Sequence, residues 1–361
     1  MEGLVAIAGA GPAGCATATA LARIGIPALL LDTLPRRKIL GESLPPAARP
    51  LLSRLGLEDA LLARSQLRAT GQESAWGSEQ LRSFDFVFTP YGHGWHVDRV
   101  SLDEDLRTNA RRAGATVYDR VSRIRWERIR DRWRVNWLSA DEKGHADVDV
   151  IVDCTGRAAR LARERPGNRR LVFDCLVAVV RRTQENGTDA SRVELEAVRE
   201  GWWYTAPTPR GRVFALFSDA DLLVVRQAQT LRGWQALMSE TRHIRGQAAE
   251  ACFDGEAIVV SARTTRLDQI SGDGWLAVGD AACTRDPLSS QGVLAALSQG
   301  RRAAEAILDH LGGRTVALRG YSEDLEAEFR RYRRTQIAYY GLENRWPRAD
   351  FWRRRHNALV E

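Results

Sequence analysis

The first thirty residues alternate between apolar runs and small residues in a pattern that predicts a strand, a tight turn, a helix and a second strand. The apolar run at 4–8 is followed at once by glycines, and then by small residues at 16–21 that suit a helix packed close on a sheet. A second apolar run, at 28–31, ends in Asp32. This spacing predicts a βαβ unit about 30 residues long.

The rest of the chain alternates between helical and extended patterns. Helical patterns are predicted at 47–65, 103–114, 292–308 and 321–340. Extended patterns are predicted at 70–97, 115–118, 121–137, 148–153, 171–180, 212–217 and 275–278. From about 168 to 265 short strands dominate. The order of these elements indicates an α/β protein in which a parallel sheet is combined with a mostly antiparallel one.

A chain of 361 residues, 44% of them hydrophobic, can form two interleaved domains. The predicted nucleotide-binding domain comprises 1–69, 98–165 and 270–312. The predicted substrate domain, a mostly antiparallel β-sheet, comprises 70–97 and 166–269. Residues 313–361 are expected to form a C-terminal helical segment.

Charge and cysteine content restrict the function only weakly. The net charge of +7 arises from 53 basic and 46 acidic residues, so we expect no nucleic-acid partner. The five cysteines include no CxxC pair, which indicates neither a disulfide framework nor a zinc site, and no metal is expected. No apolar stretch reaches the roughly 18 residues of a membrane span, and the apolar start lacks a basic segment. We therefore expect a soluble, cytoplasmic protein.

The turn after the first strand carries the first chemical signal. Residues 9–14 match the GxGxxG dinucleotide fingerprint: Gly9 permits the turn, Gly11 lets backbone amides approach a pyrophosphate, and Gly14 allows close helix–strand packing. Pro12 and Ala13 complete the turn, and the helix N-terminus faces the phosphates. Asp32, at the end of the second strand, would accept hydrogen bonds from a ribose. These features predict a dinucleotide but do not separate NAD from FAD.

A second turn near the far end of the chain makes that distinction. After the apolar run at 275–278 come Gly-Asp-Ala-Ala at 279–282 and Asp-Pro-Leu-Ser-Ser-Gln-Gly-Val at 286–293. Here the sequence resembles the glutathione-reductase-type FAD oxidoreductases, specifically the p-hydroxybenzoate-hydroxylase-like flavin monooxygenases and the flavin-dependent tryptophan halogenases. The resemblance implies a Rossmann domain that binds FAD. It implies that Asp280 binds the ribityl chain and that Pro287, Gly292 and Val293 belong to the turn that brings backbone amides to the flavin ring.

The resemblance extends to the segments at 41–44, 97–103 and 153–157. It implies that Ser43 and Val121 also belong to the cofactor site. Arg99 is a candidate for neutralising the FAD phosphates. The alternative for Arg99 is a structural salt bridge to Asp98 or Asp103.

Two features argue against halogenation. Tryptophan halogenases carry a GWxWxIP segment, but residues 201–207 read Gly-Trp-Trp-Tyr-Thr-Ala-Pro. Halogenases of this family also present a lysine in the stretch after the glycine–glutamate motif, and no lysine occurs here between Lys38 and Lys143. We expect Trp202, Trp203 and Tyr204 to face the substrate, although they could equally be core aromatics of the substrate-domain sheet.

Halogenase-like flavoproteins without these features resemble monooxygenases, and one subgroup modifies a tryptophan of a partner polypeptide during tryptophylquinone cofactor biogenesis. The segments at 339–347 and 351–356 resemble the C-terminal signature of that subgroup. The resemblance implies a reaction in which reduced flavin and molecular oxygen add oxygen to an indole carbon. The electrons would come from NAD(P)H or an external reductase. Glu42 and His96 are candidates for assisting proton movement, although either could be structural.

Three alternatives stay open. The chain could be a flavin-dependent hydroxylase or reductase of a free small molecule, since that class shares every FAD motif. It could be a halogenase despite the altered segment. It could also be a flavin-containing scaffold that docks a partner through its arginine-rich tail without chemistry. The sequence does not reveal the oligomeric state.

Overall fold

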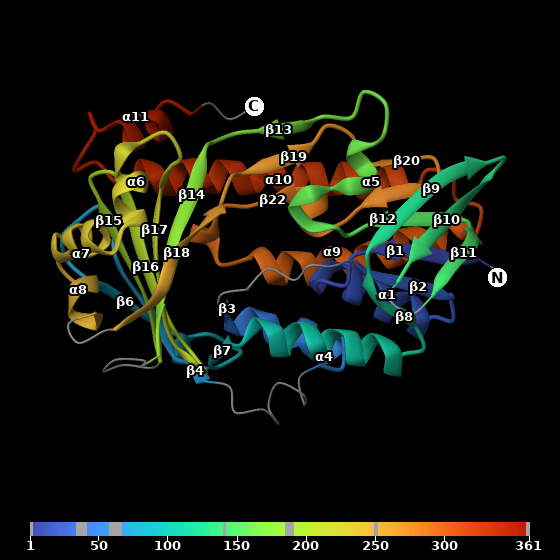
Figure 1. Ribbon diagram of the computed structural model, residues 1–361, viewed down its shortest axis with the longest axis horizontal. Coiled ribbons are helices and arrows are strands. Elements are labelled where there is room, and N and C mark those ends of the chain that lie inside the picture. The colour runs from blue at the N-terminus through green and yellow to red at the C-terminus, as the bar shows by residue number, and fades with distance from the viewer. Residues whose placement is uncertain are drawn as a thin grey trace.

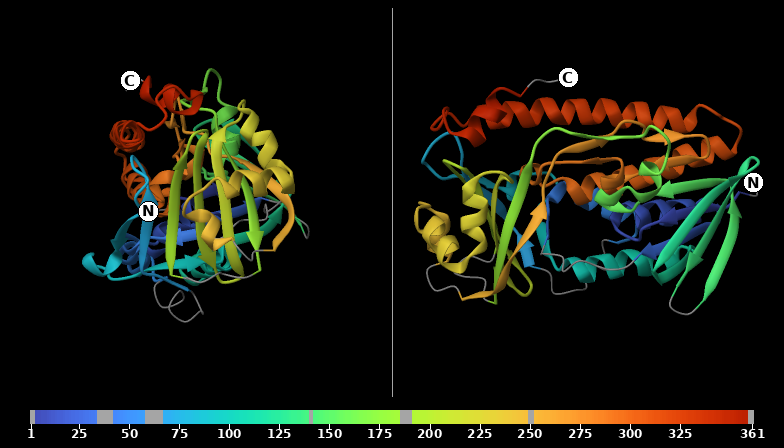
Figure 2. Two further views of the ribbon diagram at one scale, coloured as in Figure 1. Left: turned by 90° about the vertical axis from the view of Figure 1, so that its left-hand side faces the viewer. Right: turned by 45° about the horizontal axis from the view of Figure 1, so that its top comes forward.

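A computed structural model describes residues 3–33, 42–57, 67–139, 142–184, 191–248 and 252–358. Two sheets dominate it, one toward each end of an elongated molecule (Figure 1). The long helix α10 (Ala317–Gly341) extends along the molecule from one sheet to the other (Figure 2). The architecture confirms the predicted combination of a Rossmann-type parallel sheet, an antiparallel sheet and C-terminal helices.

The first sheet has six strands. Their order is β20 (Ser271–Gly272), β21 (Trp275–Ala277), β12 (Val150–Asp153), β1 (Val5–Ala8), β2 (Ala28–Thr33) and β8 (Thr116–Val121). All neighbouring pairs are parallel except β20 with β21. In chain order the five parallel strands are arranged 3-2-1-4-5, which is the order of dinucleotide-binding sheets. The carboxyl ends of β1, β12 and β21 therefore meet at the point where a dinucleotide binds.

Helices and a small sheet cover this parallel sheet. The helices are α1 (Pro12–Arg23), α4 (Arg99–Arg112), α5 (Arg160–Arg163) and α9 (Gly292–Leu311). The small sheet consists of β9 (Arg123–Ile129), β10 (Arg132–Leu138) and β11 (Lys143–Val148). It buries alternate side chains of β10, namely Trp133, Val135 and Trp137, in the same core as β1 and α1. α4 begins four residues before the predicted helix because the Asp98 carboxylate caps it, accepting the Ser101 amide at 2.9 Å.

The second sheet has seven strands. Their order is β18 (Phe253–Ser261), β14 (Leu176–Thr183), β17 (Gly211–Asp219), β16 (Gly201–Thr208), β15 (Arg192–Val198), β5 (Gly71–Ala75) and β6 (Arg82–Asp85). All pairs are antiparallel except β15 with β5. One face packs against α6 (Leu223–Gln229), α7 (Leu231–Ser239) and α8 (Ile244–Gln247). The other face packs against the end of α10 and against α11 (Asp350–His356).

Short elements join the two large sheets. One three-stranded sheet consists of β3 (Glu42–Leu44), β7 (Gly94–Val97) and β4 (Leu67–Ala69), and lies between the large sheets (Figure 1). Another consists of β13 (Arg170–Val172), β19 (Thr265–Leu267) and β22 (Cys283–Thr284). The remaining helical turns are η1 (Pro46–Ala48), α2 (Arg49–Arg54), η2 (Phe86–Phe88), η3 (Gly156–Ala158), η4 (Gly279–Ala281) and η5 (Pro287–Ser289).

Two local predictions were wrong. The helix predicted at 47–65 ends at Arg54, because the chain turns at Gly56 with φ +67°; residues 58–66 lie outside the described part. The stretch predicted as short strands contains α6, α7 and α8. Among the described residues, no helix has both the length and the apolar character needed to cross a membrane. The predicted domain boundaries stay a prediction.

Candidate flavin site

The glycine turn after β1 is shaped by two close backbone contacts and one open position. Gly9 has a φ of +102°. A Cβ at this position would lie 2.3 Å from the carbonyl oxygen of Cys154, the residue that follows β12. A Cβ on Gly14 would lie 1.9 Å from the Gly9 oxygen. Beside Gly11, by contrast, nothing described lies within 4 Å. Gly9 and Gly14 are thus required by packing, whereas Gly11 leaves the space into which a pyrophosphate could enter.

Two predicted cofactor residues lie at the neighbouring strand ends. Asp32 is 5% exposed near the end of β2. Val121, the last residue of β8, is paired in register with Thr33, and its side chain is fully buried in the core. The structure therefore leaves no exposed part of Val121 for a cofactor to contact.

The turn at Asp280 lies directly against the first glycine turn. Gly279 has φ +66°, and a Cβ there would lie 2.8 Å from the Ala13 Cβ. The Asp280 carboxylate is 3.6 Å from the Arg157 guanidinium. Arg170 donates to the Asp280 and Ala281 carbonyls at 3.3 and 2.7 Å. These contacts fix the backbone of the turn and leave the Asp280 side chain, 44% exposed, beside Arg157.

The turn from Asp286 to Gly292 precedes α9. Pro287 begins η5, and Ser290 at its end adopts φ +50°, a strained value for a residue other than glycine. Gly292 begins α9 with nothing described within 4 Å of a Cβ position, while Val293 is buried in the core. The first amides of this 20-residue helix have no side-chain cap.

These features fit FAD. α1 and α9 both begin without a side-chain cap and at positions with open space around a glycine. Uncapped helix N-termini carry free amides and a partial positive charge, which suit a pyrophosphate and the electron-rich part of a flavin. Gly11, predicted from the fingerprint, and Gly292, implied by the resemblance, are both glycines beside which the described chain leaves open space.

Arg99 connects two carboxylates beside the site. Its guanidinium lies 3.0 Å from Asp103 and 3.3 Å from Glu42. Burial raises the pKa of Glu42, and the positive charge of Arg99 opposes that rise. Burial alone would lower the pKa of Arg99, but Asp103 and Glu42 raise it overall. The predicted salt bridge to Asp103 is therefore present, and the structure adds Glu42 as a second partner.

Ser43 brings the second catalytic candidate to the same place. Because β3 pairs with β7, Ser43 lies opposite His96, and its hydroxyl is 2.8 Å from His96 Nδ1. The Tyr204 hydroxyl lies 3.4 Å from the Ser43 hydroxyl on the other side. His96 is fully buried, and burial raises the pKa of Tyr204 to about 12, so Tyr204 is protonated at neutral pH. Ser43, His96 and Tyr204 thus form one polar group between the sheets, and the Glu42 carboxylate pairs with Arg99 next to it along β3.

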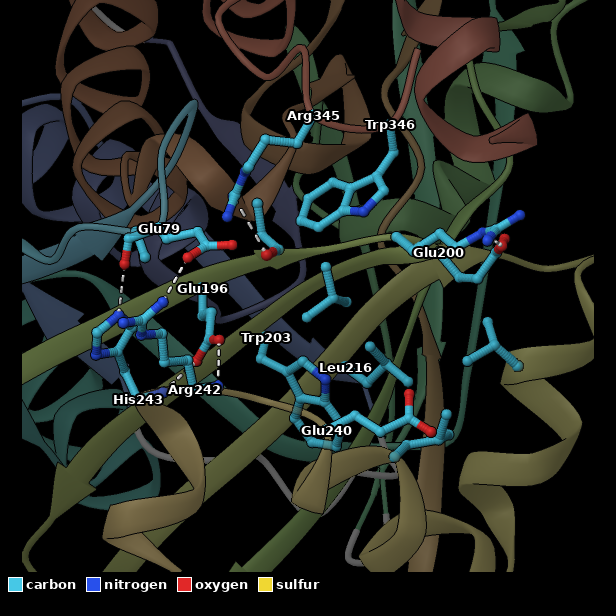
Figure 3. A pocket seen from close by; sticks show the side chains of 16 residues that line it. Glu79, Glu196, Glu200, Trp203, Leu216, Glu240, Arg242, His243, Arg345 and Trp346 are labelled. Atoms are coloured by element: carbon cyan, nitrogen blue, oxygen red, sulfur yellow. Dashed lines mark hydrogen bonds and ion pairs between the residues drawn. The ribbon is translucent and has the colours of Figure 1, made fainter. Parts of the chain in front are cut away.

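The prediction that three consecutive aromatic residues face the substrate requires correction, because alternate residues of a strand point to opposite faces. Trp202 is fully buried, stacked on Phe217 with ring centroids 3.9 Å apart. Trp203 is 1% exposed on the other face and lines, with residues such as Leu216 and Glu240, a cavity of about 330 Å³ under α7 and α8 (Figure 3). Of the three, Tyr204 is the residue placed at the polar group.

Sequence reasoning missed the arginines that hold the Asp280 turn. Arg157 lies at the end of a segment noted for its resemblance to flavoproteins, so a signal for it existed. Arg170 comes from β13, more than a hundred residues before Asp280, and no local pattern marks it. Long-range pairs of this kind become visible only in the fold.

One group of potential metal ligands occurs among the described residues. Ligand atoms of Cys175, Asp219 and Asp221 lie within 4.8 Å of one another. The Arg354 guanidinium contacts Asp219 at 3.0 Å and Asp221 at 2.7 Å. Arg355 also contacts Asp219, at 2.8 Å, so two arginines balance the charge of the two carboxylates.

The fold and the site define an FAD-dependent oxidoreductase. Residues 80–360 match the tryptophan halogenase family, so the chain belongs to this family. LodB of Marinomonas mediterranea, whose name describes an FAD-dependent oxidoreductase, is 28% identical over 79% of this chain and 78% of its own length.

Solved structures of similar fold include a halogenase and a hydroxylase. The flavin-dependent halogenase CmlS superposes with a TM-score of 0.86 at 22% identity, over 100% of this chain and 68% of its own. The peptidyl tryptophan dihydroxylase QhpG, described as essential for tryptophylquinone cofactor biogenesis, superposes with a TM-score of 0.75 at 25% identity. That superposition covers 99% of this chain and 79% of QhpG.

Proposed function

We propose that this protein is an FAD-dependent monooxygenase that hydroxylates a tryptophan side chain of a partner polypeptide during tryptophylquinone cofactor biogenesis. The chain belongs to the tryptophan halogenase family, and a tryptophan dihydroxylase is among its structural neighbours; our choice between the two reactions rests on the side chains at the flavin site. The observation that carries the proposal is the polar group of Ser43, His96 and Tyr204, with the Glu42 carboxyl beside it, which contains hydroxyls, an imidazole and a carboxyl but no lysine amine.

The positions of the lysines support this choice. The sequence contains only Lys38 and Lys143. Lys143 begins β11, in the small sheet at the end of the molecule away from the seven-stranded sheet (Figure 1). Lys38 lies outside the described residues. No described lysine can therefore serve as the amine that halogenases of this family use, and Tyr204 stands where their motif has a second tryptophan.

Bound FAD would supply the oxygen chemistry, using molecular oxygen and electrons from NAD(P)H or an external reductase. The glycine turn and the start of α9 would hold the cofactor, with Asp280 at the ribityl chain. Arg99, engaged by two carboxylates, is placed to balance charge near Glu42 rather than being free for a phosphate.

The polar group can hold and relay a proton. Tyr204, protonated at neutral pH, can donate to Ser43, and Ser43 can donate to His96 Nδ1 when that nitrogen lacks its proton. Glu42, whose pKa is raised by burial, holds a proton to a higher pH than an ordinary carboxyl does. An aromatic carbon that gains oxygen must lose a proton, and in our proposal this group accepts it.

The test uses the FAD-loaded protein with NADPH, or with NADH and a flavin reductase, in air. The precursor polypeptide of a tryptophylquinone enzyme is incubated with it and then digested and analysed by mass spectrometry. We expect one or two added oxygen atoms on a tryptophan, with no halogen when bromide is present. Free tryptophan and a precursor with the target tryptophan replaced by phenylalanine are the controls.

Unmodified precursor in the presence of demonstrable flavin reoxidation would rule out the protein substrate. Bromination of the same tryptophan would instead support the halogenase alternative. The small-molecule alternative predicts oxygenation of a free phenol or indole and none of the precursor.

A further inference from the structure

Three side chains of α10 form hydrogen bonds with one buried residue, Asp286. Tyr332, Gln336 and Tyr340 are spaced four residues apart and therefore lie on one face of the helix. The Tyr340 hydroxyl donates to Asp286 Oδ2 at 2.7 Å, and Gln336 Nε2 donates to the same oxygen at 3.0 Å. The Tyr332 hydroxyl accepts the Asp286 backbone amide at 2.6 Å. The helix thus holds both the main chain and the side chain of Asp286.

Asp286 opens the turn assigned to the flavin ring. Its other oxygen, Oδ1, accepts the Leu288 amide at 2.9 Å and so caps η5. Four residues later the chain passes through Ser290 at φ +50°, and α9 begins directly afterwards at Gly292. A strained residue of this kind persists only where surrounding contacts determine the backbone. The contacts at the start of the turn come from α10.

Hydrogen-bond chemistry fixes the direction of the network. The Tyr340 hydroxyl accepts Trp202 Nε1 at 3.0 Å, and an indole nitrogen can only donate. The single hydroxyl proton of Tyr340 is therefore committed to Asp286. Tyr340 is 2% exposed and Asp286 equally so, and burial raises the pKa of Asp286. Trp202 lies on the same face of β16 as Tyr204, so the network joins the seven-stranded sheet to the turn.

We infer that Tyr340 is a positioning residue, supported by Gln336 and Tyr332, which fixes the turn from Asp286 to Gly292 and thereby sets the environment of the flavin ring. This inference rests on the FAD site alone, so it does not depend on which substrate the enzyme oxidises. C-terminal helix α10 then has a role in the redox chemistry in addition to packing. It would act without touching the cofactor, by holding the backbone amides in place.

The test compares two neighbouring tyrosines that lose the same atom. Tyr340→Phe removes the hydroxyl that Asp286 accepts, whereas Tyr339→Phe removes a hydroxyl for which no hydrogen bond is found among the described residues. Tyr339 is 42% exposed. We expect Tyr340→Phe to raise the Kd of FAD roughly three- to tenfold, the effect of one lost hydrogen bond. We also expect it to shift the absorption spectrum and midpoint potential of the bound flavin, with Tyr339→Phe unchanged.

A purely structural role gives a different result. If Tyr340→Phe lowers the melting temperature but leaves the Kd, spectrum and potential of the flavin equal to those of Tyr339→Phe, the inference is overturned. Should Tyr340→Phe fail to fold, Gln336→Met, which removes one donor to the same oxygen at similar volume, decides the question by the same three measurements. If the wild-type protein adds no oxygen to tryptophan in the assay above, the proposed function is refuted. The flavin measurements on the variants still test this inference.

Discussion

At the scale of single residues, Arg99 determines the charge balance beside the nucleotide turn. It contacts Asp103 and Glu42, whose pKa is raised by burial. We predict that Arg99→Gln destabilises the protein increasingly as the pH rises. The folded-state pKa of Glu42 lies above its unfolded value, so ionising it on a rise in pH costs folding free energy, and without Arg99 that cost grows. Glu42 is 35% exposed and screened by water, so we expect about 1 kcal/mol at pH 7. Urea denaturation at several pH values between 4 and 8 measures this.

A double-mutant cycle isolates the contribution of Glu42. In the background of Glu42→Gln, the pH dependence of the Arg99→Gln effect should fall, because only Asp103 then loses its partner. An equal pH dependence in both backgrounds would show that Glu42 is not the group involved.

The salt bridge between Arg99 and Asp103 could be predicted, because residues four apart on a helix are neighbours. The second partner could not. Glu42 is 57 residues away and reaches Arg99 only through the pairing of β3 with β7. The alternating directions of Trp202 and Trp203 were likewise implicit in a strand, but which face meets the flavin depends on the position of the whole sheet.

At the scale of elements, the contact between helices α1 and α9 sets the geometry of the candidate flavin site. Both helices begin at this site. At Gly300 a Cβ would lie 2.6 Å from the Ala13 carbonyl oxygen and 2.8 Å from the Ala16 Cβ. We predict that Gly300→Ala forces these helices apart and costs about 1–3 kcal/mol of stability, despite the better helix propensity of alanine. FAD affinity, measured by flavin fluorescence quenching, should fall with it.

Gly320, in α10, provides the matched control. Nothing described lies within 4 Å of a Cβ at this position, so Gly320→Ala gains only helix propensity, about 0.5–1 kcal/mol. Equal effects of the two substitutions would contradict the close-packing explanation.

The predictability of an element depended on how much of its signal is local. The glycine turn, the strand before it and the acid after it are local, and β1, α1 and β2 were predicted. Helices α6 to α8 were missed because a short apolar run such as 222–225 suits a strand or a buried helix equally. One local signal was available: Thr230 caps α7, accepting the Gly233 amide at 3.1 Å.

The interleaving of segments is a property of the whole molecule, and the predicted substrate domain already joined 70–97 to 166–269; which strands pair could not be predicted. β5 and β6 precede the other strands of the seven-stranded sheet by about a hundred residues in the sequence. They join the sheet through parallel pairing of β5 with β15. Helix α10 then links the ends. Its Ser322 hydroxyl contacts Ser271 of β20 at 3.1 Å, and its Tyr340 contacts Trp202 of β16. The two sheets therefore share one helix, which also reaches the flavin turn.

Glu328 is a charged residue of α10 that ties this helix to the flavin turn and to α9. Its carboxylate pairs with Arg285, just before the flavin turn, and with Arg302 of α9. Burial alone would raise the pKa of Glu328, but the two arginines lower it overall. A lowered folded-state pKa stabilises the protein above the unfolded value of about 4.3, and that stabilisation is lost as the pH falls through the folded value.

We predict that Glu328→Gln leaves Arg285, 8% exposed, without a counter-charge and costs about 1–3 kcal/mol at pH 7. The difference from wild type should shrink as the pH falls below the ordinary glutamate value of about 4.3, because the wild-type stabilisation is lost between that value and the lower folded-state pKa. Glu323→Gln, on the same helix, removes a pair with Arg319 in which both side chains are 70% exposed, and should change stability by less than about 0.5 kcal/mol. Urea denaturation of both variants at pH 7 and at several lower values down to about pH 3, below the ordinary glutamate value, measures the effect. Glu328 joins α10 to the flavin turn and to α9. In Glu328→Gln, flavin release and tryptophan fluorescence should therefore report the same unfolding transition, shifted to lower urea concentration. A loss seen by only one probe would mean that the two ends unfold separately.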